Sequence, residues 1–261
     1  MRIGKELKIS PEFGLFQRIY TSIFGHAAVG LQMRGNFVLK ELLKILNSNQ
    51  DICNILDAGS GRGQLSFALA KYFQEKEIIG LEFQDELVKT CNIIRDKLGM
   101  DNLTFIQGDL SYPIQQGTLD LIFNIDCLEH IENDYSVVKH FGECLKKGGL
   151  LLIHVPSEEC YIFGKRFQNL DIEDHVRFGY TFESLENLLK KEGFEILWTK
   201  SSYNSFQTIC QQISFFITGS KEQNKYIYAL LYPFLRILSL LGSEPKGENG
   251  TNVSVLAKKS F

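Results

Sequence analysis

Residues 55–63 read ILDAGSGRG, and this is the most informative segment of the chain. A short apolar strand runs into glycines at alternate positions and then directly into a helix. Glycine allows positive φ angles and has no Cβ, so a ligand can approach the backbone closely there. The N-terminus of the following helix offers free N–H groups to an anion. The pattern Gly61-x-Gly63-x-x-Ser66 nearly matches a dinucleotide site, and a glycine-rich turn without a ligand is the plainer alternative.

From residue 51 onward, short apolar runs alternate with helix-like stretches. We predict strands at residues 52–58, 77–81, 103–107, 119–125, 150–155, 195–199 and 252–257. We predict helices at residues 64–73, 84–98, 135–145 and 182–191. Such alternation is typical of an α/β fold in which helices cover both faces of a mostly parallel sheet.

The chain divides into four predicted segments. Residues 1–50 form an N-terminal helical segment, within which the structure of residues 20–26 is left open. Residues 51–200 form the core, and residues 251–261 hold its last strand. Residues 201–250 are helical and apolar before a turn-rich end. An insertion at this point of an α/β sheet predicts a helical cap near the C-terminus, over the carboxyl edge of the sheet.

Polar side chains follow the strands at the edge where the glycine-rich stretch lies. Glu82 follows the second predicted strand, Asp109 follows the third, and Asn124 and Asp126 follow the fourth. In open parallel sheets, ligands bind outside the carboxyl ends of the strands, and an acid after the second strand holds ribose hydroxyls. One acid at a strand end is commonly a helix cap. A series of them beside a glycine-rich turn predicts a nucleotide-like cofactor.

On these motifs the chain resembles the class I S-adenosylmethionine-dependent methyltransferases, in particular small-molecule enzymes of type 11 and 12, over residues 50–200. The segments LDAGSGRGQ, GLEFQ, FIQGDL, LDLIFNIDCLEHI and LKKGGLLLIHVP are similar to the motifs of that family in order and spacing. The resemblance implies a Rossmann-like, seven-stranded sheet and S-adenosyl-L-methionine as cofactor, with S-adenosyl-L-homocysteine as product. A dehydrogenase of a different class is the rival, but it would not explain Gly108-Asp109-Leu110 or Glu129-His130.

The resemblance assigns a role to each matching position. Glu82 would bind the ribose hydroxyls, Phe83 would lie against the adenine, and Asn124 would face the methionine end. Asp109 would bond the adenine amino group, with the Leu110 backbone beside it. The residues that would line the methionine and ribose portion are Asp57, Gly59, Gly61 and Gly63.

Two histidines are candidates for the acceptor side. Methyl transfer is an in-line displacement, so the enzyme mainly aligns the nucleophile and, for a hydroxyl, removes its proton. His130 follows the fourth strand and His175 lies in the loop after the fifth, and a histidine can accept a proton at neutral pH. The alternatives are a structural role for His130 and a tie between His175 and Asp174. The ubiquinone-pathway O-methyltransferases bind a divalent metal through an acidic-x-x-Glu-His sequence, but Asp126 replaces their glutamate here, and we predict no metal.

The composition and the net charge limit the classes of protein to which this chain can belong. Hydrophobic residues make up 44% and charged residues 23% of the 261 residues, which suits a globular protein with a sizeable core. The formal net charge is −3 and no long basic stretch occurs, so we expect no nucleic-acid partner. The six cysteines form no Cys-x-x-Cys pair, which argues against a zinc site or a disulfide framework and fits a reducing cytosol.

The N-terminus lacks the apolar core of a signal peptide, so we expect a cytoplasmic protein. Residues 226–241, YIYALLYPFLRILSLL, are strongly apolar but shorter than the ~20 residues of a spanning helix, and they contain Pro233 and Arg236. We interpret this stretch as buried or interfacial, with a peripheral membrane contact as one role. The wider segment 206–241 has two alternative interpretations. It is either a helical cap that packs on the core or an apolar wall of the site that binds an apolar acceptor.

These observations predict an enzyme that methylates an oxygen or nitrogen of a small, lipid-like or glycan-type acceptor. A methyltransferase fold that binds the cofactor as a scaffold or sensor, without turnover, is the second hypothesis. Protein or nucleic-acid methylation is the third. It is disfavoured because the chain has Asn124-Ile125-Asp126-Cys127 after the fourth strand rather than an Asn-Pro-Pro-Tyr-type tetrapeptide. No sequence pattern specifies an oligomeric state.

Overall fold

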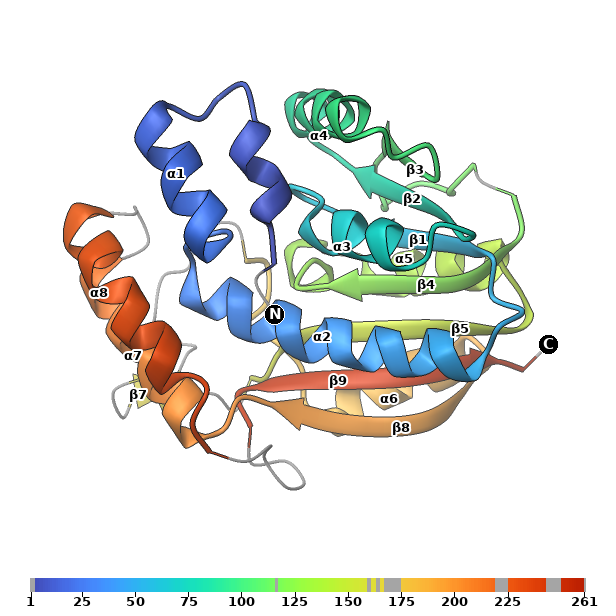
Figure 1. The fold of residues 1–261 in the computed structure, drawn as a ribbon. Coiled ribbons are helices and arrows are strands. Elements are labelled where there is room, and N and C mark those ends of the chain that lie inside the picture. Colours follow the sequence, from blue (N-terminus) through green and yellow to red (C-terminus); the bar gives the residue numbers. More distant parts are fainter. Residues whose placement is uncertain are drawn as a thin grey trace.

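A seven-stranded sheet forms the centre of the protein, with the strand order β3-β2-β1-β4-β5-β9-β8 (Figure 1). This computed structural model describes residues 3–115, 117–158, 161–162, 165–166, 175–218, 225–242 and 250–260. The strands of the sheet are β1 (Asn54–Ala58), β2 (Glu77–Glu82), β3 (Leu103–Gln107), β4 (Leu119–Ile125), β5 (Leu145–Pro156), β8 (Phe194–Ser202) and β9 (Asn252–Lys259). Strand β9 pairs antiparallel with β5 and β8, and the other pairs are parallel. The predicted mostly parallel, seven-stranded sheet is confirmed.

The fifth strand is longer than the sequence pattern predicts. It begins at Leu145 rather than at residue 150, because Leu145 pairs with Leu119 across a register shift in β4. A separate two-stranded ribbon, β6 (Tyr161–Ile162) with β7 (Lys165–Arg166), follows it.

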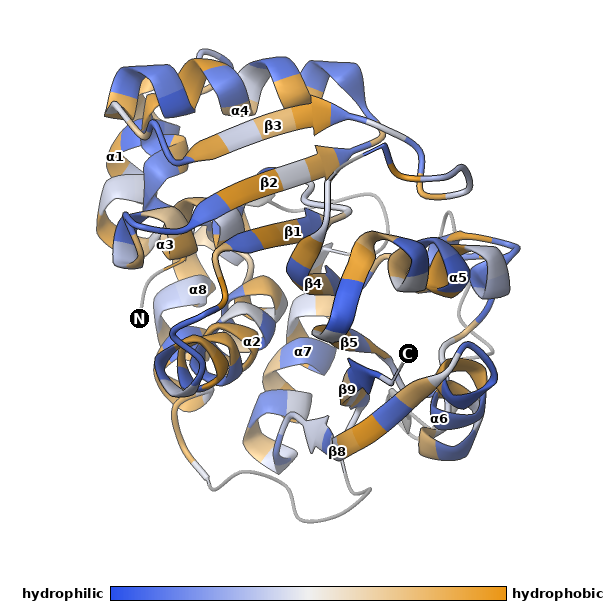
Figure 2. Cartoon of the chain, turned by 90° about the vertical axis from the view of Figure 1, so that its right-hand side faces the viewer, coloured by the Kyte–Doolittle hydropathy of each residue, from blue (hydrophilic) through white to orange (hydrophobic). Residues whose placement is uncertain are grey.

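Helices cover both faces of the sheet, and their apolar sides face the strands (Figure 2). One buried cluster joins Leu42, Phe67 and Ile94 from three helices to the strands on one face. A second cluster joins Phe141 and Leu185 to the strands on the other face. The helices are α2 (Val29–Ser48), α3 (Gln64–Tyr72) and α4 (Asp85–Leu98) on the first face, and α5 (Asp134–Cys144) and α6 (Phe182–Lys191) on the second.

The N-terminal segment begins with a 3-10 turn, η1 (Lys5–Ile9), and helix α1 (Leu15–Phe24). Helix α1 ends at Gly25, whose φ of 77° is a conformation that glycine adopts without strain. The part of residues 20–26 that the sequence left open is thus the last turn of α1 and the bend that leads into α2.

Two further helices, α7 (Ser205–Thr218) and α8 (Lys225–Leu238), lie between β8 and β9 and form the predicted insertion. They pack on the start of α2, where Val29 and Met33 share a buried cluster with Cys210 and Tyr232. The Val29 N–H donates to the Tyr228 hydroxyl at 2.8 Å, so the insertion also satisfies a backbone donor in the first turn of α2.

Residues 226–241 form most of α8 and the turn after it. Among the described residues, no helix has the length and apolar composition needed to cross a membrane. Tyr228, Tyr232 and Leu235 are buried, whereas Leu230 and Phe234 are exposed. One face of α8 therefore packs on the protein and the other lies at the surface.

Candidate active site

The glycine-rich loop connects β1 to α3 and adopts a conformation that requires its glycines. Gly59, Gly61 and Gly63 have φ angles of 84°, 54° and 69°. A Cβ on Gly59 would lie 2.5 Å from the Cys127 Sγ, whereas a Cβ on Gly61 would meet nothing within 4 Å. The loop is therefore packed tightly on its inner side and open above Gly61, where a cofactor can approach the backbone.

Glu82 ends β2 and holds this loop in place. The residue is 8% exposed, and its carboxylate accepts hydrogen bonds from the Gly61 N–H at 2.9 Å and from the Gln84 N–H at 3.0 Å. The acid that the sequence predicts as the ribose ligand thus lies directly beside the glycines.

Asp57 lies on β1 beneath the loop, and its side chain is buried. The Ser66 hydroxyl donates to its carboxylate at 2.5 Å. Burial raises the pKa of Asp57 to about 7, and the charge of Glu82 acts in the same direction, while the bond from Ser66 opposes both.

The other predicted cofactor residues lie along the same edge of the sheet. Phe83 is exposed, and Asp109 accepts a hydrogen bond from the Ser111 N–H at 2.8 Å. Leu110 is buried, and its carbonyl lies 3.2 Å from the His140 Nδ1. Asn124 is buried and donates to the Ala58 carbonyl at 2.7 Å. The individual roles that the resemblance assigns to these residues stay predictions.

The buried Asn124 also supports a ligand at this edge. Its Oδ1 has no hydrogen-bond partner within the described part of the chain. A buried acceptor of this kind is costly unless something donates to it. The open space above Gly61 and this acceptor fit an adenosyl-type cofactor with donor groups.

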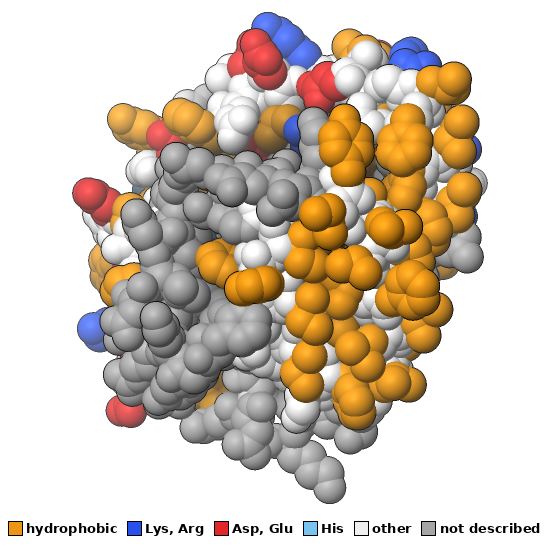
Figure 3. Space-filling view, turned by 90° about the vertical axis from the view of Figure 1, so that its left-hand side faces the viewer, with side chains coloured by type: hydrophobic (Ala, Val, Ile, Leu, Met, Phe, Trp, Pro, Cys, Tyr) orange, Lys and Arg blue, Asp and Glu red, His pale blue; other side chains and the backbone are white. Residues whose placement is uncertain are grey.

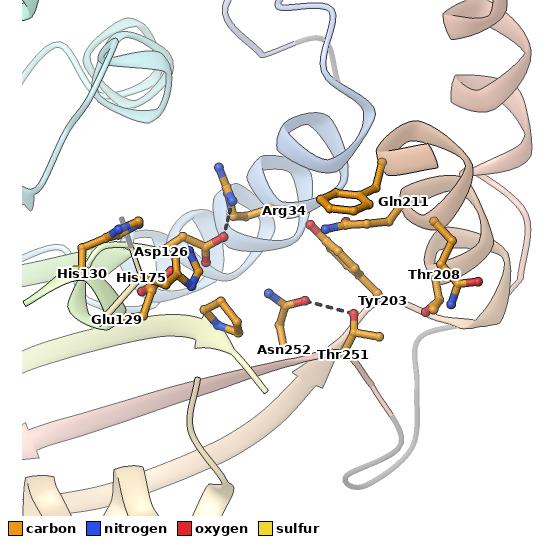
Figure 4. Close-up of a pocket in the computed structure, with 13 residues that line it drawn as sticks. Arg34, Asp126, Glu129, His130, His175, Tyr203, Thr208, Gln211, Thr251 and Asn252 are labelled. Atoms are coloured by element: carbon orange, nitrogen blue, oxygen red, sulfur yellow. Dashed lines mark hydrogen bonds and ion pairs between the residues drawn. The ribbon is translucent and has the colours of Figure 1, made fainter. Parts of the chain in front are cut away.

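A cavity of about 360 Å³ lies beside the loop, between the carboxyl ends of β4 and β5 and helix α7 (Figure 4). It contains both histidines that the sequence singles out. Its lining residues are Arg34, Asp126, Glu129, His130, Pro156, His175, Tyr203, Thr208, Gln211, Gln212, Phe215, Thr251 and Asn252.

Asp126 is the charged centre of this cavity. It has a positive φ of 44°, forms an ion pair with Arg34, and lies 2.6 Å from the His154 Nδ1. Although burial favours the neutral acid, Arg34 and His154 lower the pKa of Asp126 to about 2. The carboxylate is therefore ionised, and both of its oxygens have partners.

The pKa of Glu129 is shifted in the opposite direction from that of Asp126. It is 1% exposed, and its Oε2 has no hydrogen-bond partner among the described residues. Burial and then the charge of Asp126 raise the pKa of Glu129 well above its usual value. Burial thus favours the protonated form of Glu129, in contrast to Asp126.

His130 and His175 meet in the cavity. Their ring centroids are 4.5 Å apart at an angle of 80°. The Val176 N–H donates to the Glu129 carbonyl at 3.2 Å, which ties the second loop to the first. Ligand atoms of Glu129, His130 and His175 all lie within 4.8 Å of one another, so this group could hold a metal ion. Asp174, the alternative partner of His175, lies outside the described residues.

Comparison with known proteins agrees with this geometry. The family described as a methyltransferase domain matches residues 49–226. The chain belongs to this methyltransferase family. The resemblance deduced from the motifs is confirmed.

Two curated relatives are named after different methyl acceptors. The malonyl-[acyl-carrier protein] O-methyltransferase 2 of Ilyobacter polytropus is 30% identical over 56% of this chain and 55% of its own length. A probable (S)-tetrahydroprotoberberine N-methyltransferase 2 of Papaver bracteatum is 29% identical over 49% of this chain and 35% of its own length. The methyltransferase chain therefore spans about half the length of such relatives, or less.

Two solved structures share the fold. The phosphoethanolamine N-methyltransferase 2 of Haemonchus contortus, in complex with S-adenosyl-L-methionine, has a TM-score of 0.64 at 20% identity, over 92% of this chain and 55% of the other. The magnesium protoporphyrin IX methyltransferase of Synechocystis, with bound S-adenosyl-L-homocysteine, has a TM-score of 0.57 at 14% identity, over 95% of this chain and 89% of the other. At these identities the likeness concerns the fold.

Two residues that line the methyltransferase cavity, and a buried one that contacts its Asp126, are not predicted by the sequence analysis. Arg34 lies in the N-terminal helical segment, far in the sequence from Asp126, and no local pattern marks it. Tyr203 follows β8 and has a positive φ of 69°. His154, the buried contact of Asp126, is not among the predicted site residues, although an ionisable side chain within the apolar run LLLIHVP is a signal, because a buried histidine needs partners.

The raised pKa of Asp57 predicts how stability depends on pH. The folded protein keeps a proton on Asp57 that the unfolded chain releases near pH 4, so this contribution to stability is present at low pH and is lost as pH rises through about 7. Asp57→Asn stays neutral throughout. We expect urea unfolding to show this between about pH 4 and pH 8. As the pH rises, the free energy of unfolding of the variant should increase by roughly 1 kcal/mol or more relative to that of the native chain.

Asp101→Asn is the matched control, since it changes an exposed aspartate in a turn. If the free energies of unfolding of the native chain and of Asp57→Asn change in parallel over this pH range, the raised pKa of Asp57 is refuted.

Proposed function

We propose that this methyltransferase transfers the methyl group of S-adenosyl-L-methionine to a hydroxyl, or in second place an amine, of a small, lipid-like or glycan-type acceptor. The observation that carries the proposal is the position of the histidine cavity. Its lining residue Asp126 directly precedes Cys127, whose side chain packs on Gly59 of the loop. The acceptor cavity and the cofactor loop are therefore immediate neighbours.

The cofactor fits the residues at this edge. Glu82 would hold the ribose hydroxyls, Asn124 would face the methionine portion, and the open backbone at Gly61 would allow close approach. When bound, the cofactor supplies a methyl group on a positively charged sulfonium, which is a good leaving group. The chain then needs only to align the acceptor and to manage one proton.

The charge states in the cavity select the group that takes the proton. The Asp126 carboxylate is bound by Arg34 and His154 on its two oxygens, and burial raises the pKa of Glu129 well above its usual value. His130 would accept the hydroxyl proton as the acceptor oxygen attacks the methyl carbon and the carbon–sulfur bond breaks. His175, edge to face with His130, would hold that imidazole in position.

The lining of the cavity favours a polar acceptor group. Helix α7 presents Thr208, Gln211 and Gln212 to the cavity, with Phe215 beside them. This lining is more polar than the apolar wall that the aromatic content of residues 206–241 suggested. The methylated part of the acceptor would be hydrogen-bonding, such as a sugar or a polar head group. The O- and N-methyltransferase names of the relatives are compatible with either atom.

Removing the base should separate chemistry from cofactor binding. His130→Ala should lower turnover by roughly 10²–10⁴-fold and leave the affinity for S-adenosyl-L-methionine nearly unchanged. Turnover is measured as labelled-methyl transfer to a fractionated cell extract, with mass analysis of the product. Glu132→Ala is the matched control, because it changes an exposed side chain two positions further along the same loop.

General-base catalysis would be abandoned if His130→Ala and His175→Ala both kept near-normal turnover on the true acceptor. A loss of cofactor affinity together with folding stability would instead assign His130 a structural role. Absence of transfer by the native chain to any fraction would favour the scaffold or sensor hypothesis.

The proposal also predicts that turnover does not need a metal. Asp126 is engaged by Arg34 and His154, and burial favours the protonated form of Glu129, so neither acid is a ready ligand. Excess EDTA should leave the rate of methyl transfer unchanged. A rate that falls with EDTA and returns with Mg²⁺, Mn²⁺ or Zn²⁺ would instead make Glu129, His130 and His175 a catalytic metal site.

A further inference from the structure

Helices α1 and α8 together present a broad apolar surface to the outside (Figure 3). We refer to it as the outer apolar surface. Its residues, with their exposed fractions, are Leu15 76%, Phe16 64%, Ile19 54% and Ile23 48% of α1, and Tyr226 76%, Ile227 54%, Leu230 73%, Phe234 69% and Ile237 65% of α8. Large contiguous apolar patches of this kind are rare on soluble monomers and mark interaction sites.

The two helices form one rigid support for this surface. The Tyr20 hydroxyl donates to the Ala229 carbonyl at 2.6 Å, which ties α1 directly to α8. On the inner side, the rings of Phe24 and Tyr232 are 5.9 Å apart. Each helix therefore has an apolar inner face that packs on the protein and a second apolar face that the core does not need.

The helices that carry this surface have charged side chains of one sign only, and the nearby Glu12, which precedes α1, is paired with Arg62. Helices α1, α7 and α8 contain no Asp or Glu, although the chain has 31 of them. Arg18 of α1 and Arg236 of α8 are among their basic residues. Apolar side chains flanked by cations suit a surface that is apolar inside and anionic at its boundary.

A second cavity lies at the end of α8, beside this surface. It has a volume of about 210 Å³ and lies between α2 and the last turn of the insertion. Lys40 and Arg236 line it together with the exposed Leu240, and no acid is among its lining residues. Tyr203 lines both this cavity and the one that contains His130. A basic cavity at an apolar margin suits an anionic head group.

We propose that the outer apolar surface docks this protein on an anionic lipid bilayer. The exposed side chains of α1 and α8 would enter the boundary between head groups and acyl chains, with Tyr226 near the polar level and Arg18 and Arg236 against anionic head groups. The contact is peripheral and needs no spanning helix. It does not depend on which atom the enzyme methylates.

Charge favours a bilayer over a second copy of the chain. In a two-fold symmetric dimer the same patch faces itself, so the cations of both copies would share one interface with no acid from these helices to offset them. An anionic bilayer removes that repulsion. The membrane contact expected from residues 226–241 thus becomes a two-helix surface that also includes α1.

Vesicle flotation tests this proposal. The native chain should float with vesicles made of equal parts phosphatidylcholine and phosphatidylglycerol, and less with phosphatidylcholine alone or at high salt. Leu230→Glu with Phe234→Glu should reduce the bound fraction by about tenfold or more, because two charges enter the apolar boundary. Ile93→Glu with Leu197→Glu is the matched control, since these residues are 41% and 44% exposed on α4 and β8.

Calorimetric binding of S-adenosyl-L-methionine by both double variants would show that they are folded. Failure of the native chain to float would overturn the proposal, as would equal flotation by the α8 variant. Light scattering that shows a dimer of the native chain, converted to monomer by the α8 changes, would assign the surface to a second copy instead. None of these results depends on turnover, so the proposed reaction stands or falls separately.

Discussion

The close packing of Gly59 against Cys127 is the constraint on which the site depends. A side chain on Gly59 would overlap the Cys127 Sγ, and the Asn124 amide ties the two segments again by donating to Ala58. The loop after β1 and the loop after β4 therefore hold a fixed separation. A reaction catalysed by alignment of a nucleophile and a methyl carbon about 3–3.5 Å apart needs this rigidity more than it needs strong acids or bases.

The charges of the cavity follow from the same rigidity. Asp126 emerges from β4 in a left-handed conformation and is met by Arg34 from α2 and His154 from β5. Burial raises the pKa of Glu129, and the fixed negative charge of Asp126 acts in the same direction. One acid is therefore paired with cations, and burial favours the protonated form of the other; under the proposed function, the histidine pair would then exchange the proton with the acceptor.

Local patterns predicted the parts of the molecule that local chemistry determines. The glycine-rich turn, the strand-end position of Glu82 and the alternation of strands and helices follow from backbone sterics and apolar periodicity. Arg34 could not be predicted, because its partner is brought to it only by the packing of α2 on the sheet. For residues 226–241 the sequence predicted a buried or interfacial segment, but not which side of α8 is covered, since that depends on how the helix packs.

Titration calorimetry tests the central claim most directly. The account predicts that S-adenosyl-L-methionine and S-adenosyl-L-homocysteine bind the native chain and that NAD does not. Glu82→Ala should weaken the binding of both adenosyl compounds, because charge-assisted hydrogen bonds worth about 1.5–3 kcal/mol each are lost. Glu77→Ala, at the exposed opposite end of β2, should bind normally. Tight binding of NAD, or no binding of either adenosyl compound, would contradict the account.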